Sequence, residues 1–398
     1  MRLTPVALVA LVALVALAGS GTPEPARVAQ LVTDFGLRLF RAALAARGDT
    51  NVVFAPLGAT SVLVALQVAT AGRGRQQLEA ATGFSIDGPG VSAELRGLLR
   101  ALRGPGHVLE VAQGLFVARG VALRRGFVAR LVRALGPRSL ARLDLASGEG
   151  ARRVLNAWAR ERTRGLVAGL VAPGAVAPGA RLLVASAEFF RGSWGVPFPA
   201  RATRARPFGR ADGTAGAVPM MARTGRFRCG DFETPQGVPF TVAEVPYAGG
   251  EVALLLVAPV QRHVPAATLL PLLDVPNVTG WVARLRPAPR VLVLPRFSLE
   301  TSWDLRGPLK ALGVLDLFDP DSADFSPLSG EERLVLGQVL QKVRMEVAEN
   351  GTEAASASAA VVYSRMAPPE ILLDRPFLFL IRHHPTGAVL FVGQVTDP

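Results

Sequence analysis

The chain has 398 residues, half of them hydrophobic and 19% charged, and 44 Lys and Arg against 31 Asp and Glu leave a net charge of +13. This composition excludes a disordered or low-complexity protein. The single cysteine, Cys229, excludes an intramolecular disulfide framework and a cysteine-based zinc cluster. No Pro/Ser/Gly-rich hinge divides the sequence into separately buried halves, so we expect one large domain.

The N-terminal residues have the pattern of a secretory signal. A positive end at Met1-Arg2 precedes an unbroken apolar run of 13 residues, Val6 to Ala18, which small residues follow. This run is shorter than the roughly 20 residues of a membrane-spanning helix. A short buried helix is the alternative, which the extreme N-terminal position disfavours. We therefore predict a signal peptide over 1–20, a single domain over 21–398, an extracellular location and no membrane span.

The next predicted elements include both helices and strands. Glu94 to Arg103 has leucines at helical spacing and precedes Gly104-Pro105-Gly106. Val291 to Leu294 and Phe377 to Ile381 are apolar runs of strand length. Helices and strands in blocks predict an α+β domain. Two glycosylation sequons, at Asn277 and Asn350, agree with export.

Basic residues are unevenly distributed, and 42 of the 44 are Arg. From Arg119 to Arg164 there are twelve Arg and three acidic residues, so +9 of the +13 lies there. Arg96, Arg100 and Arg103 share one face of the helix predicted over Glu94 to Arg103. These clusters favour a sulfated polysaccharide such as heparin as a partner, with a solvated charged face as the alternative. We do not expect nucleic acid to bind an exported chain.

Motifs of catalysis are largely absent from the sequence. It contains no Gly-x-Ser-x-Gly elbow, no His-Glu-x-x-His and no phosphate-binding loop. Cys229 lacks an identifiable His partner, and His383-His384 is interpreted as part of a turn between two apolar strands. We therefore predict neither enzyme activity nor a metal or cofactor site.

The segment from Glu349 to Pro369 is the unusual one. Every residue from Ala354 to Ala360 is Ala or Ser, and a lone Arg365 follows. A flexible linker is one interpretation. However, apolar strands are predicted on both sides, and a long structureless loop in a compact domain is usually functional. Small side chains on both faces and the hinge at Gly351 would allow the loop to become a strand inside a sheet.

Such insertion would release a large free energy. Fifteen extended residues span roughly 50 Å. Pairing on both edges at about 1 kcal/mol per hydrogen bond releases on the order of 10 kcal/mol. This equals the roughly 5–15 kcal/mol that keeps a typical domain folded. The loop could therefore do mechanical work on a molecule attached to it.

A series of short motifs in a fixed order resembles the serpin family. The resemblance runs from about Asp34 to Pro398, and the motifs that carry it are Asn51-Val52-Val53-Phe54-Ala55-Pro56, Asn156-Ala157-Trp158, Val218-Pro219-Met220-Met221, Val245-Pro246-Tyr247, Leu294-Pro295-Arg296-Phe297, Asp374-Arg375-Pro376-Phe377-Leu378-Phe379 and Gly393-Gln394-Val395. The resemblance implies three β-sheets, about nine helices and an exposed reactive-centre loop over about 349–369.

The resemblance also implies a function. It places the scissile bond at Arg365-Met366 and implies covalent trapping of a trypsin-like serine protease, followed by insertion of the loop into the main sheet. The inhibitory hinge that it implies consists of Glu349, Gly351, Thr352, Glu353, Ala354 and Ala355. The alternative is a non-inhibitory serpin that acts as a glycosaminoglycan- or ligand-binding module.

The implied partners are the urokinase-type and tissue-type plasminogen activators, heparin-like polysaccharide and, as a further candidate, vitronectin. The implied protein is a monomer. Arg119 joins the three helix arginines as a basic residue expected at the polysaccharide site. Ala55 and Ser186 depart from the serine and asparagine that are usual in the family at the points that control sheet opening, so we expect different hydrogen bonds there.

Overall fold

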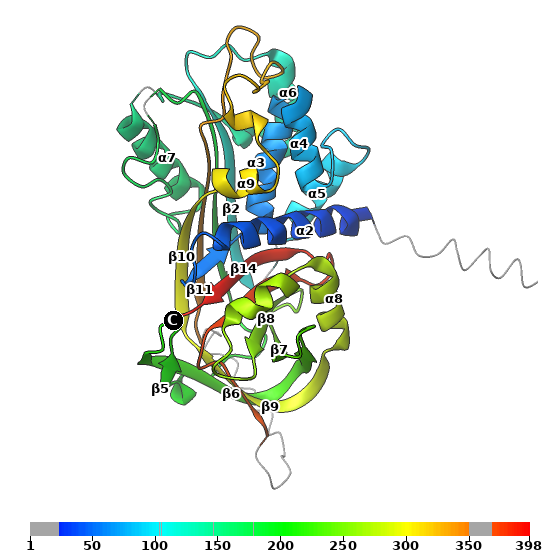
Figure 1. Ribbon diagram of the computed structural model, residues 1–398, viewed down its shortest axis with the longest axis vertical. Helices are drawn as coiled ribbons and strands as arrows, with labels where there is room; N and C mark the ends of the chain where they lie inside the picture. The colour runs from blue at the N-terminus through cyan, green and yellow to red at the C-terminus, as the bar shows by residue number, and fades with distance from the viewer. Residues whose placement is uncertain (1–23, 103, 105, 146, 178, 350–367) are drawn as a thin grey trace, which may run out of the picture.

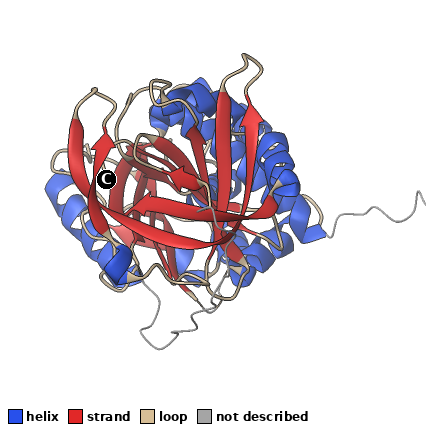
Figure 2. Cartoon of the chain, turned by 90° about the horizontal axis from the view of Figure 1, so that it is seen from below, coloured by secondary structure: helices blue, strands red, loops and turns tan. Residues whose placement is uncertain are grey.

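The computed structural model describes residues 24–102, 104, 106–145, 147–177, 179–349 and 368–398. The predicted signal peptide lies outside these residues. In the described part, eight α-helices and four short 3-10 helices surround two hydrogen-bonded sheets (Figures 1 and 2). The 3-10 helices span Pro137–Ser139, Ala200–Ala202, Ala266–Leu272 and Asp316–Phe318.

The first sheet has five strands in the order β10-β11-β4-β2-β3. Their bounds are Phe297–Asp304 for β10, Gln338–Val347 for β11, Leu182–Gly192 for β4, His107–Ala118 for β2 and Leu140–Leu143 for β3. The pairs β10–β11 and β2–β4 are antiparallel, whereas β11–β4 is parallel. The central strands run along the long axis of the molecule (Figure 1).

The second sheet has nine strands, with β1-β14-β13-β8-β7-β6-β9-β12 as its main path and β5 also paired to β6. The bounds are Val52–Phe54 for β1, Arg204–Gly209 for β5, Ala215–Glu233 for β6, Pro239–Pro246 for β7, Val252–Pro259 for β8, Arg286–Pro295 for β9, Glu370–Leu372 for β12, Phe377–His383 for β13 and Val389–Val395 for β14. The 19-residue β6 joins the β5 and β9 side of this sheet to the β7 and β8 side. The second and third of the three expected sheets are therefore continuous through β6.

The α-helices cover both faces of the five-stranded sheet, with α7 on one side and the group containing α3 on the other (Figure 1). Every residue of α3 is buried, and Pro56 begins this helix at a position where a missing N–H costs nothing. The helices span Glu24–Leu44 (α2), Pro56–Ala69 (α3), Gly72–Thr82 (α4), Val91–Ala101 (α5), Arg125–Leu135 (α6), Gly148–Arg162 (α7), Val275–Arg284 (α8) and Arg306–Ala311 (α9).

The predicted elements are present, with shifted boundaries. The helix predicted over Glu94 to Arg103 is α5, which starts earlier because Gly90 supplies the left-handed N-cap, and ends at Ala101. The strands predicted at 291–294 and 377–381 lie inside β9 and β13. The α+β serpin-like architecture is confirmed. No helix among the described residues combines the length and apolarity needed to cross a membrane.

Candidate functional site

The predicted reactive loop connects the two sheets. It leaves the five-stranded sheet after β11 and enters the nine-stranded sheet at β12, which pairs in parallel with β9. Residues 350–367 lie outside the described part of the chain. They include most of the predicted site, namely Asn350, Gly351, Thr352, Glu353, Ala354, Ala355, Arg365 and Met366.

The start of the loop is contacted by side chains that lie just beyond the ends of neighbouring strands. The Trp194 indole N–H donates to the Ala348 carbonyl at 2.7 Å, and its ring stacks on Tyr247 with 4.5 Å between centroids. Glu349, a predicted hinge residue, accepts a hydrogen bond from the Thr203 hydroxyl at 2.8 Å. Its other oxygen lies 3.9 Å from Arg296. Side-chain contacts therefore hold Ala348 and Glu349, where the hinge begins.

The end of the loop is attached to the other sheet. The Val291 amide donates to the Pro369 carbonyl at 3.1 Å, and Glu370 begins β12. The Glu370 carboxylate pairs with Arg206 at 3.0 Å. Because the two attachment points lie in different sheets, insertion of the loop next to β11 requires either a break in the chain between them or the release of β12 from β9.

The β4–β11 boundary has the geometry that an inserting strand needs. We call this boundary the seam. The two strands pair directly and in parallel from Gln338↔Leu183 to Glu346↔Arg191, so no other described strand lies between them. A chain that turns back after β11 runs antiparallel to β11, and therefore also antiparallel to β4. Such a strand could form antiparallel ladders, the slightly more stable kind, on both edges.

Polar side chains join the seam to the start of α3. Gln341 on β11 donates from Nε2 to the Ala55 carbonyl at 2.9 Å and to the Ser186 hydroxyl on β4 at 3.4 Å. Its Oε1 accepts the Ala55 amide at 3.4 Å. Sequence analysis singled out Ala55 and Ser186 but missed Gln341, which supplies the contacts between them.

Glu188 lies next to this network and also escaped the sequence analysis. Its residue is 1% exposed, and neither carboxylate oxygen has a hydrogen-bond partner. Burial raises the pKa of the Glu188 carboxyl well above its ordinary value, and the nearby Ser186 hydroxyl offsets this only in part. The one signal in the sequence is an acidic residue inside an otherwise apolar or small run, 182–190.

The predicted polysaccharide residues are only partly brought together. Arg96 and Arg100 lie on α5, whose Leu95 and Leu98 are buried. Arg100 is exposed, whereas Arg96 donates to the Arg133 carbonyl in the last turn of α6. Arg103 lies outside the described residues. Arg119 is exposed beyond the far end of β2, roughly 35 Å along the strand from its α5 end at about 3.3 Å per residue.

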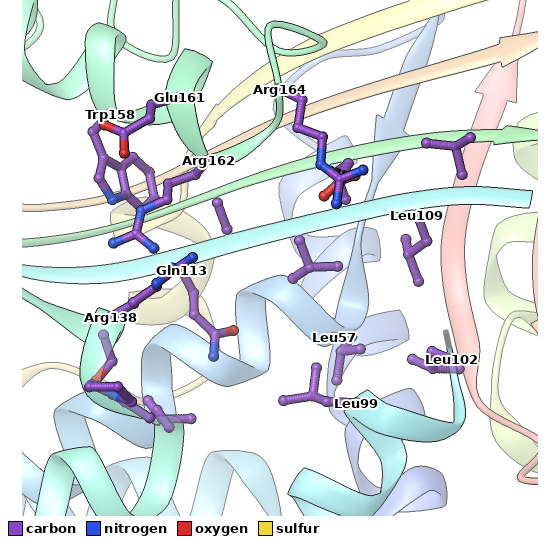
Figure 3. Close-up of a pocket in the computed structure, with 18 of the residues that line it drawn as sticks. Leu57, Leu99, Leu102, Leu109, Gln113, Arg138, Trp158, Glu161, Arg162 and Arg164 are labelled. Atoms are coloured by element: carbon purple, nitrogen blue, oxygen red, sulfur yellow. Dashed lines mark hydrogen bonds and ion pairs between the residues drawn. The ribbon is translucent and has the colours of Figure 1, made fainter. Parts of the chain in front are cut away.

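A cavity of about 990 Å³ lies along the edge of β2 (Figure 3). Leu57, Leu99 and Trp158 contribute apolar walls, and three arginines at 138, 162 and 164 contribute positive charge. Arg164 also pairs with Glu110 at 3.3 Å. The cavity therefore combines apolar and cationic surfaces.

The remaining predicted residues have structural surroundings. Asn277, at a predicted glycosylation sequon, is half-buried in the first turn of α8, where its backbone N–H donates to the N-cap Asp274 at 2.7 Å. Cys229 is a buried free thiol. The turn predicted to include His383-His384 begins at His384, because His383 is the buried last residue of β13. Among the described residues, no three His, Cys, Asp or Glu side chains are placed to hold a metal ion.

Comparison with known proteins identifies the class. Residues 30–398 match the model of the family described as serpin (serine protease inhibitor). The chain therefore belongs to the serpin family.

The individual relatives narrow the resemblance. Plasminogen activator inhibitor 1 from Neovison vison is 43% identical over 374 residues, which cover 94% of this chain and 93% of the relative. Glia-derived nexin from Rattus norvegicus is 33% identical over 93% of each chain. The crystal structure of native protease nexin-1 with heparin has a TM-score of 0.87 and 31% identity, and it covers 94% of this chain and 100% of its own.

Proposed function

We propose that this protein is a secreted inhibitor that traps trypsin-like serine proteases covalently, with plasminogen activators of the urokinase and tissue types as its targets. The observation that carries the proposal is the parallel, directly paired seam next to the strand from which the loop emerges. The similarity to plasminogen activator inhibitor 1 supports the choice of targets.

In the proposed mechanism, the catalytic groups belong to the protease. Arg365 enters its acidic specificity pocket as a charge-paired anchor. The protease serine attacks the Arg365 carbonyl, and the bond to Met366 breaks as an acyl-enzyme forms. The break frees the loop from its attachment at β12, so that it inserts into the seam and carries the acylated protease with it.

Incubation with urokinase tests this function. We expect an SDS-stable adduct and cleavage after Arg365. The Arg365→Ala variant should form no adduct with Arg-specific proteases but should retain heparin binding, because the two sites are separate. Thr352→Arg is the matched hinge variant: it should be cleaved without forming an adduct, since insertion would bury an unpaired charge. Cleavage of the unmodified protein without an adduct would instead support a non-inhibitory binding module.

Heparin-like polysaccharide is the second proposed partner. Exposed Arg100 on α5 and the arginines of the neighbouring α6 support it, as does the relative solved with heparin. Arg119, because of its position, belongs to a separate contact. Removal of Arg100 should weaken retention on immobilised heparin and reduce its salt dependence. Full retention would assign the site to other arginines.

The remaining parts of the proposal concern the mature protein. We propose cleavage of the signal at about residue 20, a single domain over 21–398 that acts as a monomer, and glycans on Asn277 and Asn350. Vitronectin is a further proposed partner. Mass spectrometry of protein secreted from eukaryotic cells, before and after glycosidase treatment, tests the N-terminus and both sequons.

A further inference from the structure

Glu188 is placed where a charge is difficult to accommodate. Its carboxyl lies against Gly58 of α3, so closely that an added Gly58 Cβ would stand 1.6 Å from Oε1. Only a glycine at that position leaves room for the group. A buried carboxylate with neither oxygen partnered is strongly disfavoured, so the neutral form predominates while the sheet is closed.

The surroundings offer Glu188 no charge to pair with. Helix α3 contains no ionisable side chain. On β11, Lys342, Arg344 and Glu346 alternate with Gln341 and form ion pairs away from α3, Lys342 with Glu300 and Arg344 with Glu346. The inward neighbours on this strand are Gln341 and Val343, which is the register partner of Glu188.

Strand β2, on the other side of β4, also offers Glu188 no charge to pair with. Its register partner for Glu188 is Val111, and the adjacent Glu110 pairs with Arg164 on the opposite face. The titratable group on the inward face of β2 is His107, four residues from Val111, where it stacks on Phe190 at 5.8 Å. Glu188 thus has no described counter-ion while the seam is closed.

We propose that Glu188 couples the separation of β4 from β11 to the loss of a proton, so that the seam opens more readily as the pH rises. Separation of the two strands admits water to the carboxyl, and hydration makes the ionised form acceptable. The proposal depends on the proposed function for its biological purpose, since the seam is where the loop would insert. It does not depend on that function for its test.

The direction of the pH dependence follows from the difference in the pKa of Glu188 between the closed and the open sheet. Burial raises the pKa of Glu188 in the closed sheet above the ordinary value of 4.5 that a hydrated carboxyl has. Below that ordinary value both states are protonated, and the closed sheet keeps its full stability. As the pH rises toward the raised pKa, the closed sheet loses stability relative to the open one, by up to about tenfold in the opening equilibrium per pH unit.

Hydrogen–deuterium exchange of the protein alone tests this coupling. Protection factors of the β4 and β11 amides, corrected for intrinsic exchange, should fall as the pH rises from the ordinary carboxyl range toward the raised pKa of Glu188, with a slope no steeper than the linkage limit. In Glu188→Gln, which keeps the shape but cannot ionise, they should stay constant. Glu300→Gln removes a half-exposed carboxylate from the same sheet and should follow the unmodified protein.

Two results would overturn the proposal. One is an unchanged pH dependence in Glu188→Gln, and the other is constant protection in the unmodified protein. Should Glu188→Gln fold poorly, Glu188→Leu provides the same comparison without a buried polar group. Because no protease is present, this outcome is independent of the adduct assay. If exchange at the seam depends on pH as expected but urokinase forms no adduct, the proposed inhibitory function is rejected and the proposed role of Glu188 stands.

Discussion

The two sheets differ in the side chains that surround their central strands. In the nine-stranded sheet, Leu378, Phe379 and Leu380 of β13 are fully buried between antiparallel neighbours, with apolar side chains around them. In the five-stranded sheet, the inner face at the parallel β4–β11 seam carries a buried carboxyl without a partner and a bridging glutamine. The first arrangement favours permanent closure, whereas the second leaves free energy to be gained when the strands rearrange.

The largest expected effect on stability concerns the nine-stranded sheet. Phe379 is fully buried and packs against Phe297 with 5.9 Å between ring centroids. Phe379→Ala should lower the free energy of unfolding by about 3–5 kcal/mol. Denaturant titration measures this loss. Leu315→Ala, at a side chain that is 51% exposed, is the control and should change stability by less than about 0.5 kcal/mol.

Gly58→Ala tests the packing of α3 against the seam. The new methyl group would collide with the Glu188 carboxyl, and overpacking of this kind costs about 1–3 kcal/mol. Gly97→Ala, in α5 where an added Cβ meets no atom within 4 Å, should instead be neutral or stabilising. Glu188→Ala should rescue much of the Gly58→Ala defect. Equal losses in the two glycine variants would contradict the close approach.

Glu188→Leu should have a smaller effect of the opposite sign. Removal of an unpartnered buried polar group should stabilise the protein by about 1–2 kcal/mol near neutral pH. The gain should shrink on acidification, because the raised pKa of Glu188 means that the closed sheet is disfavoured only when the pH exceeds the ordinary carboxyl range. Thermal unfolding at acidic and mildly alkaline pH measures both. A gain that does not vary with pH would contradict the buried proton.

The smallest expected effect lies on the outer face of the same strands. Lys342 of β11 pairs with Glu300 of β10 at 2.6 Å, and Glu300 is 42% exposed. Glu300→Ala should cost less than about 1 kcal/mol, and less still at high salt, because solvent screens the pair. Stability measured at two ionic strengths checks this. A large, salt-independent loss would mean that the outer face also controls the seam.

The sequence predicted the architecture better than the site. Ordered motifs such as Leu294-Pro295-Arg296-Phe297 indicated the fold, and apolar runs located β9 and β13, because these signals are local. The surroundings of Glu188 depend on Gly58, which lies 130 positions earlier in the chain. No spacing rule reveals that these two residues meet. Arg119 was grouped with the arginines of α5 because of its charge. The structure shows that these residues lie at opposite ends of β2.

The central claim is that cleavage lets the loop enter the seam between β4 and β11. Thermal unfolding of the protein before and after cleavage at Arg365-Met366 tests it most directly. Insertion that releases on the order of 10 kcal/mol should raise the unfolding midpoint by roughly 10 °C for a chain of this length. An unchanged midpoint in the fully cleaved protein would contradict the account.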